Sequence, residues 1–250
     1  DRIITYVKPQ DFFIVIDAVK AQEPDYYTFS NIWHTQHIHE QGPHYYATSI
    51  DSIRSAHLPQ DKRLLIQFLA NEAKSDSFYT EDRHYQQEQA IYQTEASNYK
   101  DGDYEIFITV LYPFNSGDPV APYLNRVKLL STADYPRSVA LQIDGSNGSR
   151  SYLGLKIDLQ SELARENIRP RYTWENGRYA FGDFETDAHF IYATVTDDSV
   201  RYAASNVLKV IYDGRPLMQA LPNTHGLQLD GAPDRVGFVK WRAWEGASGR

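Results

Sequence analysis

Short runs of apolar residues, separated by turn residues at strand-like spacing, dominate the chain. The first two runs, Arg2 to Val7 and Phe12 to Lys20, flank the segment Lys8-Pro9-Gln10-Asp11. Pro fixes the backbone angle φ and Asp can bond to the backbone that follows it, so this segment predicts a β-hairpin. Further runs rich in Val, Ile, Tyr and Phe follow at 26–34, 44–50, 63–69 and 105–112.

The second half repeats the pattern with clearer turns. Asn176-Gly177, the strongest hairpin signal of the chain, stands between the runs 172–174 and 179–181. Turn residues at 144–148 separate 139–143 from 151–159, and those at 197–199 separate 189–196 from 200–204. Only Ser161 to Ile168 has helical spacing, with Ser161 as a candidate N-cap.

So many consecutive strands predict an all-β fold, a large antiparallel β-sandwich with at least about twelve strands and no helix longer than about three turns. The composition changes near Asp213-Gly214-Arg215-Pro216, after which Gly and Pro become more frequent. We therefore expect a sandwich over residues 1–214 and a C-terminal extension over 215–250 that packs on it.

Charge and composition exclude several classes of partner and of metal site. The formal net charge of −8 opposes binding to the phosphate backbone of nucleic acids, so a nucleic-acid partner is not expected. No run of apolar residues is long enough to span a membrane. The chain has no cysteine, which excludes disulfides and thiolate metal sites. It begins at Asp1 and its single methionine is Met218, so we interpret it as a processed or excised portion of a longer protein.

A histidine-rich stretch carries the candidate chemistry. Four of the eight histidines lie between His34 and His44. In an extended chain His37 and His39 share one face and can converge on one divalent metal ion, whereas His34 points to the other face. The alternative is a polar loop decorated with imidazoles. We expect the stretch at the edge of the sandwich, facing a concave surface. The motifs of nucleophile elbows, phosphate loops and zinc helices are absent.

Several segments share the pattern of one enzyme family. The sequence RIITYVKPQDFFIVID at 2–17 resembles the R-x-x-x-x-V-K-P-x-x-Y-F-V-V-x-D strand pair of the heparinase II/III-like polysaccharide lyases. The segment YTFSNIWH at 27–34 is similar to the next strand of that family, and ITVLYP at 108–113 is similar to its T-V-L-Y-P strand. FETDA at 184–188, with the run 207–214, resembles the closing pattern.

The resemblance implies the C-terminal β-sandwich region of an enzyme that cleaves uronic-acid polysaccharides, such as glycosaminoglycans, by β-elimination in the periplasm or outside the cell. It places the catalytic Tyr and His upstream of this chain, in an (α/α) toroid domain and an H-x-H segment, so the segment alone is expected to be inactive. It makes His34 a candidate ligand of a divalent metal ion, zinc or calcium. Its partners would be an acidic polysaccharide and the upstream toroid.

Two other interpretations stay open at this point. In the first, the chain is a non-catalytic carbohydrate-binding β-sandwich in which Trp33, Tyr45, Tyr46 and Trp174 form a stacking platform, although aromatic residues also fill cores. In the second, it is a structural or adhesion sandwich without a site, and His34 is a half-buried histidine at a strand end. The residues predicted to contact a polysaccharide are Trp33, His37, His39, Tyr45 and Tyr46.

Overall fold

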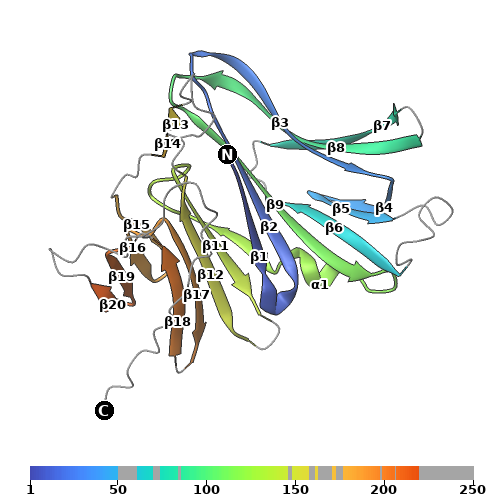
Figure 1. Ribbon diagram of the computed structural model, residues 1–250. Helices are drawn as coiled ribbons and strands as arrows, with labels where there is room; N and C mark the ends of the chain where they lie inside the picture. Colours follow the sequence, from blue (N-terminus) through green and yellow to red (C-terminus); the bar gives the residue numbers. More distant parts are fainter. Residues whose placement is uncertain are drawn as a thin grey trace. The chain divides into compact units, whose positions relative to one another are not determined.

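The computed structural model describes residues 1–49, 61–69, 74–83, 86–145, 148–157, 161–162, 171–172, 177–197, 199–205 and 207–219. Within these residues the chain forms 20 strands, one 3-10 turn and one four-residue α-helix (Figure 1). Every strand pairing described is antiparallel. The predicted all-β antiparallel sandwich fold with at least twelve strands is confirmed, and the helices among the described residues are short.

The chain divides into two compact units, Asp1–Arg126 and Val127–Arg250. In the first unit a six-stranded sheet has the order β1-β2-β9-β6-β5-β4. Its strands are β1 (Arg2–Val7), β2 (Phe12–Lys20), β4 (His37–Gly42), β5 (Tyr45–Ser49), β6 (Lys62–Phe68) and β9 (Tyr104–Asn115). The predicted first hairpin is present, because the turn η1 (Lys8–Gln10) and Asp11, at φ 54°, connect β1 to β2.

A second sheet of this unit has three strands in the order β3-β8-β7 (Figure 1). They are β3 (Asp25–Thr35), β8 (Gln86–Tyr99) and β7 (Ser75–Arg83). One face of this sheet packs against the six-stranded sheet, where Ile91 joins Tyr46, Ile66 and Phe68 in a buried cluster. The other face is turned away from that core.

Polar groups also connect the two sheets of the first unit. The Asn31 side-chain amide on β3 donates to the Thr109 hydroxyl on β9 at 2.8 Å, and both residues are buried. The Lys74 ammonium, just before β7, contacts the Glu105 carboxylate on β9. Because unpaired buried polar groups are costly, these pairs restrict how the two sheets can pack.

The helix α1 (Ala121–Leu124) covers part of the opposite face of the six-stranded sheet. There the ring of Tyr123 lies 5.5 Å from that of Tyr112, a buried residue of β9. The Gln67 side chain on β6 donates a hydrogen bond to the Leu124 carbonyl. Both faces of the six-stranded sheet are therefore partly covered within this unit.

The second unit is also a sandwich. Its larger sheet has the order β10-β11-β12-β17-β18 and its smaller sheet the order β15-β16-β19-β20. The strands are β10 (Val127–Leu130), β11 (Ser138–Asp144), β12 (Arg150–Lys156), β15 (Tyr179–Phe181), β16 (Phe184–Thr186), β17 (Phe190–Thr196), β18 (Ser199–Ser205), β19 (Lys209–Tyr212) and β20 (Arg215–Gln219). Tyr152, Ile191, Phe181 and Phe184 from the two sheets share one buried cluster.

Two local predictions in this unit involve residues outside the described ranges. The strand β15 pairs with β16 through a tight turn, with Phe181 opposite Phe184. The predicted hairpin across Asn176-Gly177 stays a prediction, because most of its first strand is not described. The stacked rings of Phe181 and Phe184, 5.5 Å apart, are both buried by this pairing. The segment predicted to be helical begins instead with the short strand β13 (Ser161–Glu162), which pairs with β14 (Arg171–Tyr172). Residues 163–168 and 173–176 lie outside the described residues.

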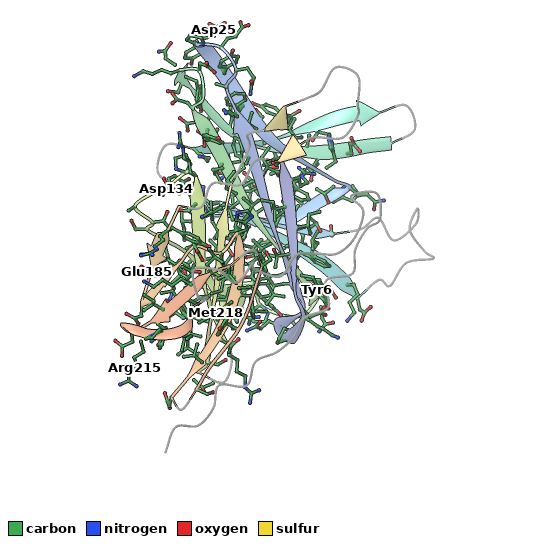
Figure 2. The ribbon with its side chains drawn as sticks, turned by 60° about the vertical axis from the view of Figure 1, so that its left-hand side comes forward. Tyr6, Asp25, Asp134, Glu185, Arg215 and Met218 are labelled. Atoms are coloured by element: carbon green, nitrogen blue, oxygen red, sulfur yellow. The ribbon has the colours of Figure 1, made fainter. Side chains whose placement is uncertain are left out.

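The start of the expected C-terminal extension is part of this sandwich. Residues Arg215–Gln219 form β20, the edge strand that pairs with β19. Figure 2 shows Arg215 and Met218 on this edge, and Met218 packs against the buried cluster of the unit. The remainder of the expected extension, 220–250, lies outside the described residues.

Candidate functional site on the three-stranded sheet

The sheet β3-β8-β7 presents two chemically different faces. Successive side chains of a strand point to opposite faces, so Trp33 and Asn31 face the core while Ile32 and His34 lie on the outer face. Ile32 is 41% exposed although it is apolar. We call the outer cluster formed by Ile32, His34, Tyr79, Glu88 and Tyr92 the tyrosine–histidine face.

The strand register brings this cluster together. Ala90 on the central strand lies opposite His34 on one side and opposite Tyr79 on the other. One step along the sheet, Tyr92 lies opposite Ile32. Residues opposite one another in antiparallel strands point to the same face, so three strands contribute to one surface.

Two tyrosine rings form the largest feature of this surface. Tyr79 and Tyr92 are diagonal neighbours on β7 and β8, with ring centroids 5.5 Å apart and ring planes at 74°. Tyr79 is 59% exposed. The two rings therefore enclose an angle instead of forming one flat platform, and each presents an apolar ring with a polar tip.

An imidazole and a carboxylate lie beside the rings. The His34 Nδ1 atom is 3.0 Å from Glu88 Oε1, and the His34 side chain is 35% exposed. Glu88 precedes Ala90 by two residues, so it is the diagonal neighbour of His34 on the same face. The imidazole therefore lies beside a carboxylate that is mostly buried.

The predicted metal ligands do not converge. The chain passes from one sheet to the other between His34, on β3, and His37, on β4. The register of β4 shifts between Ile38 and Glu40, so His39 sits at an irregularity, and His37 and His39 are both exposed. Among the residues that the structure describes, no three His, Asp or Glu side chains form a group that could hold a metal ion. His34 and Glu88 offer two ligands, one short of the usual minimum for zinc, and metal binding by His34 stays a prediction.

The predicted stacking residues have other surroundings. Trp33 packs toward the core, with the Arg2 guanidinium 5.7 Å from its ring centroid. Tyr46 is buried. Tyr45 donates a hydrogen bond to Glu40 at 3.1 Å, and its ring lies so close to Gly42 that an added Cβ there would clash. Trp174 lies outside the described residues.

A second polar cluster lies at the tip of the β4–β5 hairpin. The His44 Nδ1 atom is 2.6 Å from Asp76 Oδ1, and the Tyr46 hydroxyl donates to Asp76 Oδ2 at 2.8 Å. Burial, followed by the hydrogen bond to Asp76 and its charge, raises the pKa of Tyr46. Tyr46 is therefore a neutral hydrogen-bond donor at ordinary pH and not a base.

Comparison with family models and with curated proteins finds no match to this chain. The resemblance to the heparinase II/III-like lyases therefore remains a prediction that rests on the quoted segments. Within the described residues, no helix combines the length and apolar character needed to cross a lipid bilayer.

Proposed function

We propose that this chain is the C-terminal β-sandwich part of a polysaccharide lyase, and that its tyrosine–histidine face holds the polysaccharide. The observation that carries the proposal is the pair of exposed Tyr79 and half-buried Tyr92 beside the His34–Glu88 pair. Sugar rings have apolar faces and hydroxyl edges, so aromatic rings next to polar side chains suit them. The quoted family segments support the lyase assignment, since those at 2–17, 27–34 and 108–113 fall on strands of this same unit.

In such a reaction a base removes the proton at C5 of the uronate, which lies α to the carboxylate. The C4–O bond then breaks, a C4–C5 double bond forms, and an acid protonates the departing oxygen. We assign the acid and base to the upstream domain that the resemblance implies. The role of this chain in the proposal is to bind and orient the polysaccharide, and no step passes through a metal ion.

Binding of oligosaccharides to the full chain, measured by calorimetry, tests the proposal. Tyr79→Ala and Tyr92→Ala should each weaken binding about tenfold, which corresponds to about 1.4 kcal/mol. Tyr26→Ala is the matched control, because Tyr26 is 60% exposed on the same outer face but lies eight residues from His34 along β3. Equal affinity for the wild type and for both variants would contradict the proposed site.

A second candidate is a non-catalytic carbohydrate-binding module, which the same two tyrosine rings support. Release of unsaturated uronate, followed by its absorbance at about 230–235 nm, separates the two candidates. The chain alone should be inactive in this assay under either candidate. The protein that carries the upstream domain should be active only if the lyase assignment is right.

A further inference from the structure

We infer that β1, an edge strand of the six-stranded sheet, pairs with β1 of a second copy of this chain. The resulting dimer is two-fold symmetric and joins two six-stranded sheets into one continuous antiparallel sheet. The inference does not depend on the proposed function, because β1 and the tyrosine–histidine face belong to different sheets.

The outer edge of β1 carries backbone groups with which no described strand pairs. β1 is the first strand in the order of its sheet, and its one neighbour there is β2. Asp1 and Ala18 exchange both of their backbone hydrogen bonds, at 2.7 and 2.8 Å. Because such pairs alternate along an antiparallel ladder, the odd-numbered residues of β1 also bond to β2. The N–H and C=O groups of Arg2, Ile4 and Tyr6 therefore point outward.

This edge lacks the features by which proteins usually protect an edge strand from pairing. Those features are charged side chains, proline and β-bulges. The sequence Ile3-Ile4-Thr5-Tyr6-Val7 contains no charge and no proline, and all five residues are β-branched or aromatic. The strand also pairs with β2 without a shift of register. An edge of this composition is suited to accept another strand.

Apolar side chains follow the same edge. Ile4 is 61% exposed, Tyr6 48% and Phe13 37%. Tyr6 lies opposite Phe13, and Ile4 lies opposite Val15, so these side chains share one face of the sheet. The rings of Tyr6 and Phe13 are stacked, with centroids 4.8 Å apart. Pairing of two copies along this edge brings their exposed apolar side chains together and removes them from water.

One register pairs all three outward-pointing residues at once. In it Ile4 lies opposite Ile4 of the second copy, and Arg2 lies opposite Tyr6 of the second copy. The Tyr6 hydroxyl donates to the Asp11 carboxylate at 2.6 Å, so each guanidinium meets an aromatic ring and a carboxylate. The Arg2 side chain is 54% exposed, and its bonds to Asp17 use two of its five N–H groups. The two ends of β1 therefore carry complementary charges, which a second antiparallel copy matches.

Sedimentation of the full chain at protein concentrations from about 1 to about 500 µM tests the inference, because dimer formation depends on concentration. We expect an equilibrium between monomer and dimer. Ile4→Lys places two like charges opposite one another and should weaken the dimer at least about tenfold. Leu208→Lys is the control, since Leu208 is 44% exposed in the second unit and the same charge there should leave the dimer unchanged. Circular dichroism verifies that both variants are folded.

A cysteine cross-link tests the register. The chain has no cysteine, so a single introduced thiol reports on its own position. Residues that exchange both hydrogen bonds across an antiparallel pair have Cα atoms about 5.5 Å apart, which a disulfide can span. Ile4→Cys should therefore form an intermolecular disulfide under mild oxidation. Tyr6→Cys is the matched control, because Tyr6 is exposed on the same face but its two copies would lie about 13 Å apart along the strands.

A chain that stays monomeric over the whole concentration range would overturn the inference and leave this edge to a strand of another protein. A dimer that Ile4→Lys does not weaken would overturn it as well, and so would cross-linking of Tyr6→Cys as readily as of Ile4→Cys. The cross-link does not require Ile4→Lys to fold, because Ile4→Cys introduces no charge. None of these outcomes bears on the proposed function, which oligosaccharide binding tests separately.

Discussion

The imidazole of His44 lies 2.6 Å from the carboxylate of Asp76, and this contact connects the tip of the β4–β5 hairpin to the strand β7 of the other sheet. His44 is 45% exposed, whereas the carboxylate is mostly buried. The second carboxylate oxygen accepts the hydroxyl of buried Tyr46. The Asp76 carboxylate thus contacts two side chains, and its removal should weaken the contact between the two sheets.

Asp76→Ala should lower the free energy of unfolding by about 2 kcal/mol or more, because the buried Tyr46 hydroxyl would lose its acceptor. Asp76→Asn should cost less, since an amide oxygen can still accept from that hydroxyl. Urea denaturation measures both changes. Asp101→Asn, at an exposed turn, is the control and should stay within about 0.5 kcal/mol of the wild type. Asp76→Ala with wild-type stability would show that the cluster contributes nothing to the fold.

His44 adopts a backbone conformation that β-carbon-bearing residues rarely hold, with φ at 59°. His44→Ala keeps this strain and removes the bond to Asp76, whereas His44→Gly removes both the bond and the strain. The glycine variant should therefore be the more stable of the two by about 1 kcal/mol. Thermal unfolding of the pair measures the difference, and an alanine variant as stable as the glycine variant would mean that the turn is not strained.

The fold class followed from the sequence because period-2 runs and turn residues are local signals. The segments at 2–7, 12–20, 139–143 and 190–196 alternate or are continuously apolar, and each is a strand. The strands β7 and β8 carry no such signal. Their core-facing positions include Asp76, Gln93 and Glu95, which read as a solvated polar stretch although Gln93 is completely buried.

Most residues of the candidate site lie on β7 and β8, the strands that the sequence pattern did not predict. His34 and Trp33 were singled out in the sequence, but Tyr79, Glu88 and Tyr92 were not. Their proximity to His34 is set by the register of β3 and β8, which pairs residues more than 50 positions apart in the chain, and by the pairing of β7 with β8. Local spacing carries no information about such a register. Likewise, β3 and β4 belong to different sheets, which separates His34 from His37, and this change of sheet depends on tertiary packing that local spacing does not reveal.

Tyr112 should make stability fall at alkaline pH. Burial raises the pKa of its phenol, against a smaller opposing effect of Arg126. A folded-state pKa above the unfolded value of about 10 means that the folded state retains the proton longer, so the contribution to stability is full below pH 10 and is lost as the pH rises further. Tyr112→Phe should therefore resist alkaline unfolding better than the wild type.

At neutral pH the same variant should be neutral or slightly stabilising, because the buried Tyr112 hydroxyl has no hydrogen-bond partner among the described residues. Unfolding curves at pH 7 and above pH 10 give the stability of Tyr112→Phe relative to the wild type under the two conditions. Tyr6→Phe is a less buried comparison, and it removes a hydrogen bond to Asp11 on the surface near the β1–β2 turn (Figure 2). A loss of about 2 kcal/mol in Tyr112→Phe at neutral pH would reveal a hydroxyl partner that these residues do not provide.

Gly154 on β12 is closely packed against Phe181 and Ile191 in the second unit. A Cβ atom placed there would lie 2.6 and 2.7 Å from two ring atoms of Phe181 and 3.0 Å from the Ile191 side chain. Phe181 is buried and stacked on Phe184, so its ring has little room to move away. Gly154→Ala should consequently destabilise the fold by about 1–3 kcal/mol, even though alanine is less flexible in the unfolded chain. Gly117→Ala is the matched control, because nothing lies within 4 Å of a Cβ at that position. Chemical denaturation of the two variants should therefore separate them clearly, and a Gly154→Ala protein as stable as Gly117→Ala would mean that Phe181 can repack at little cost.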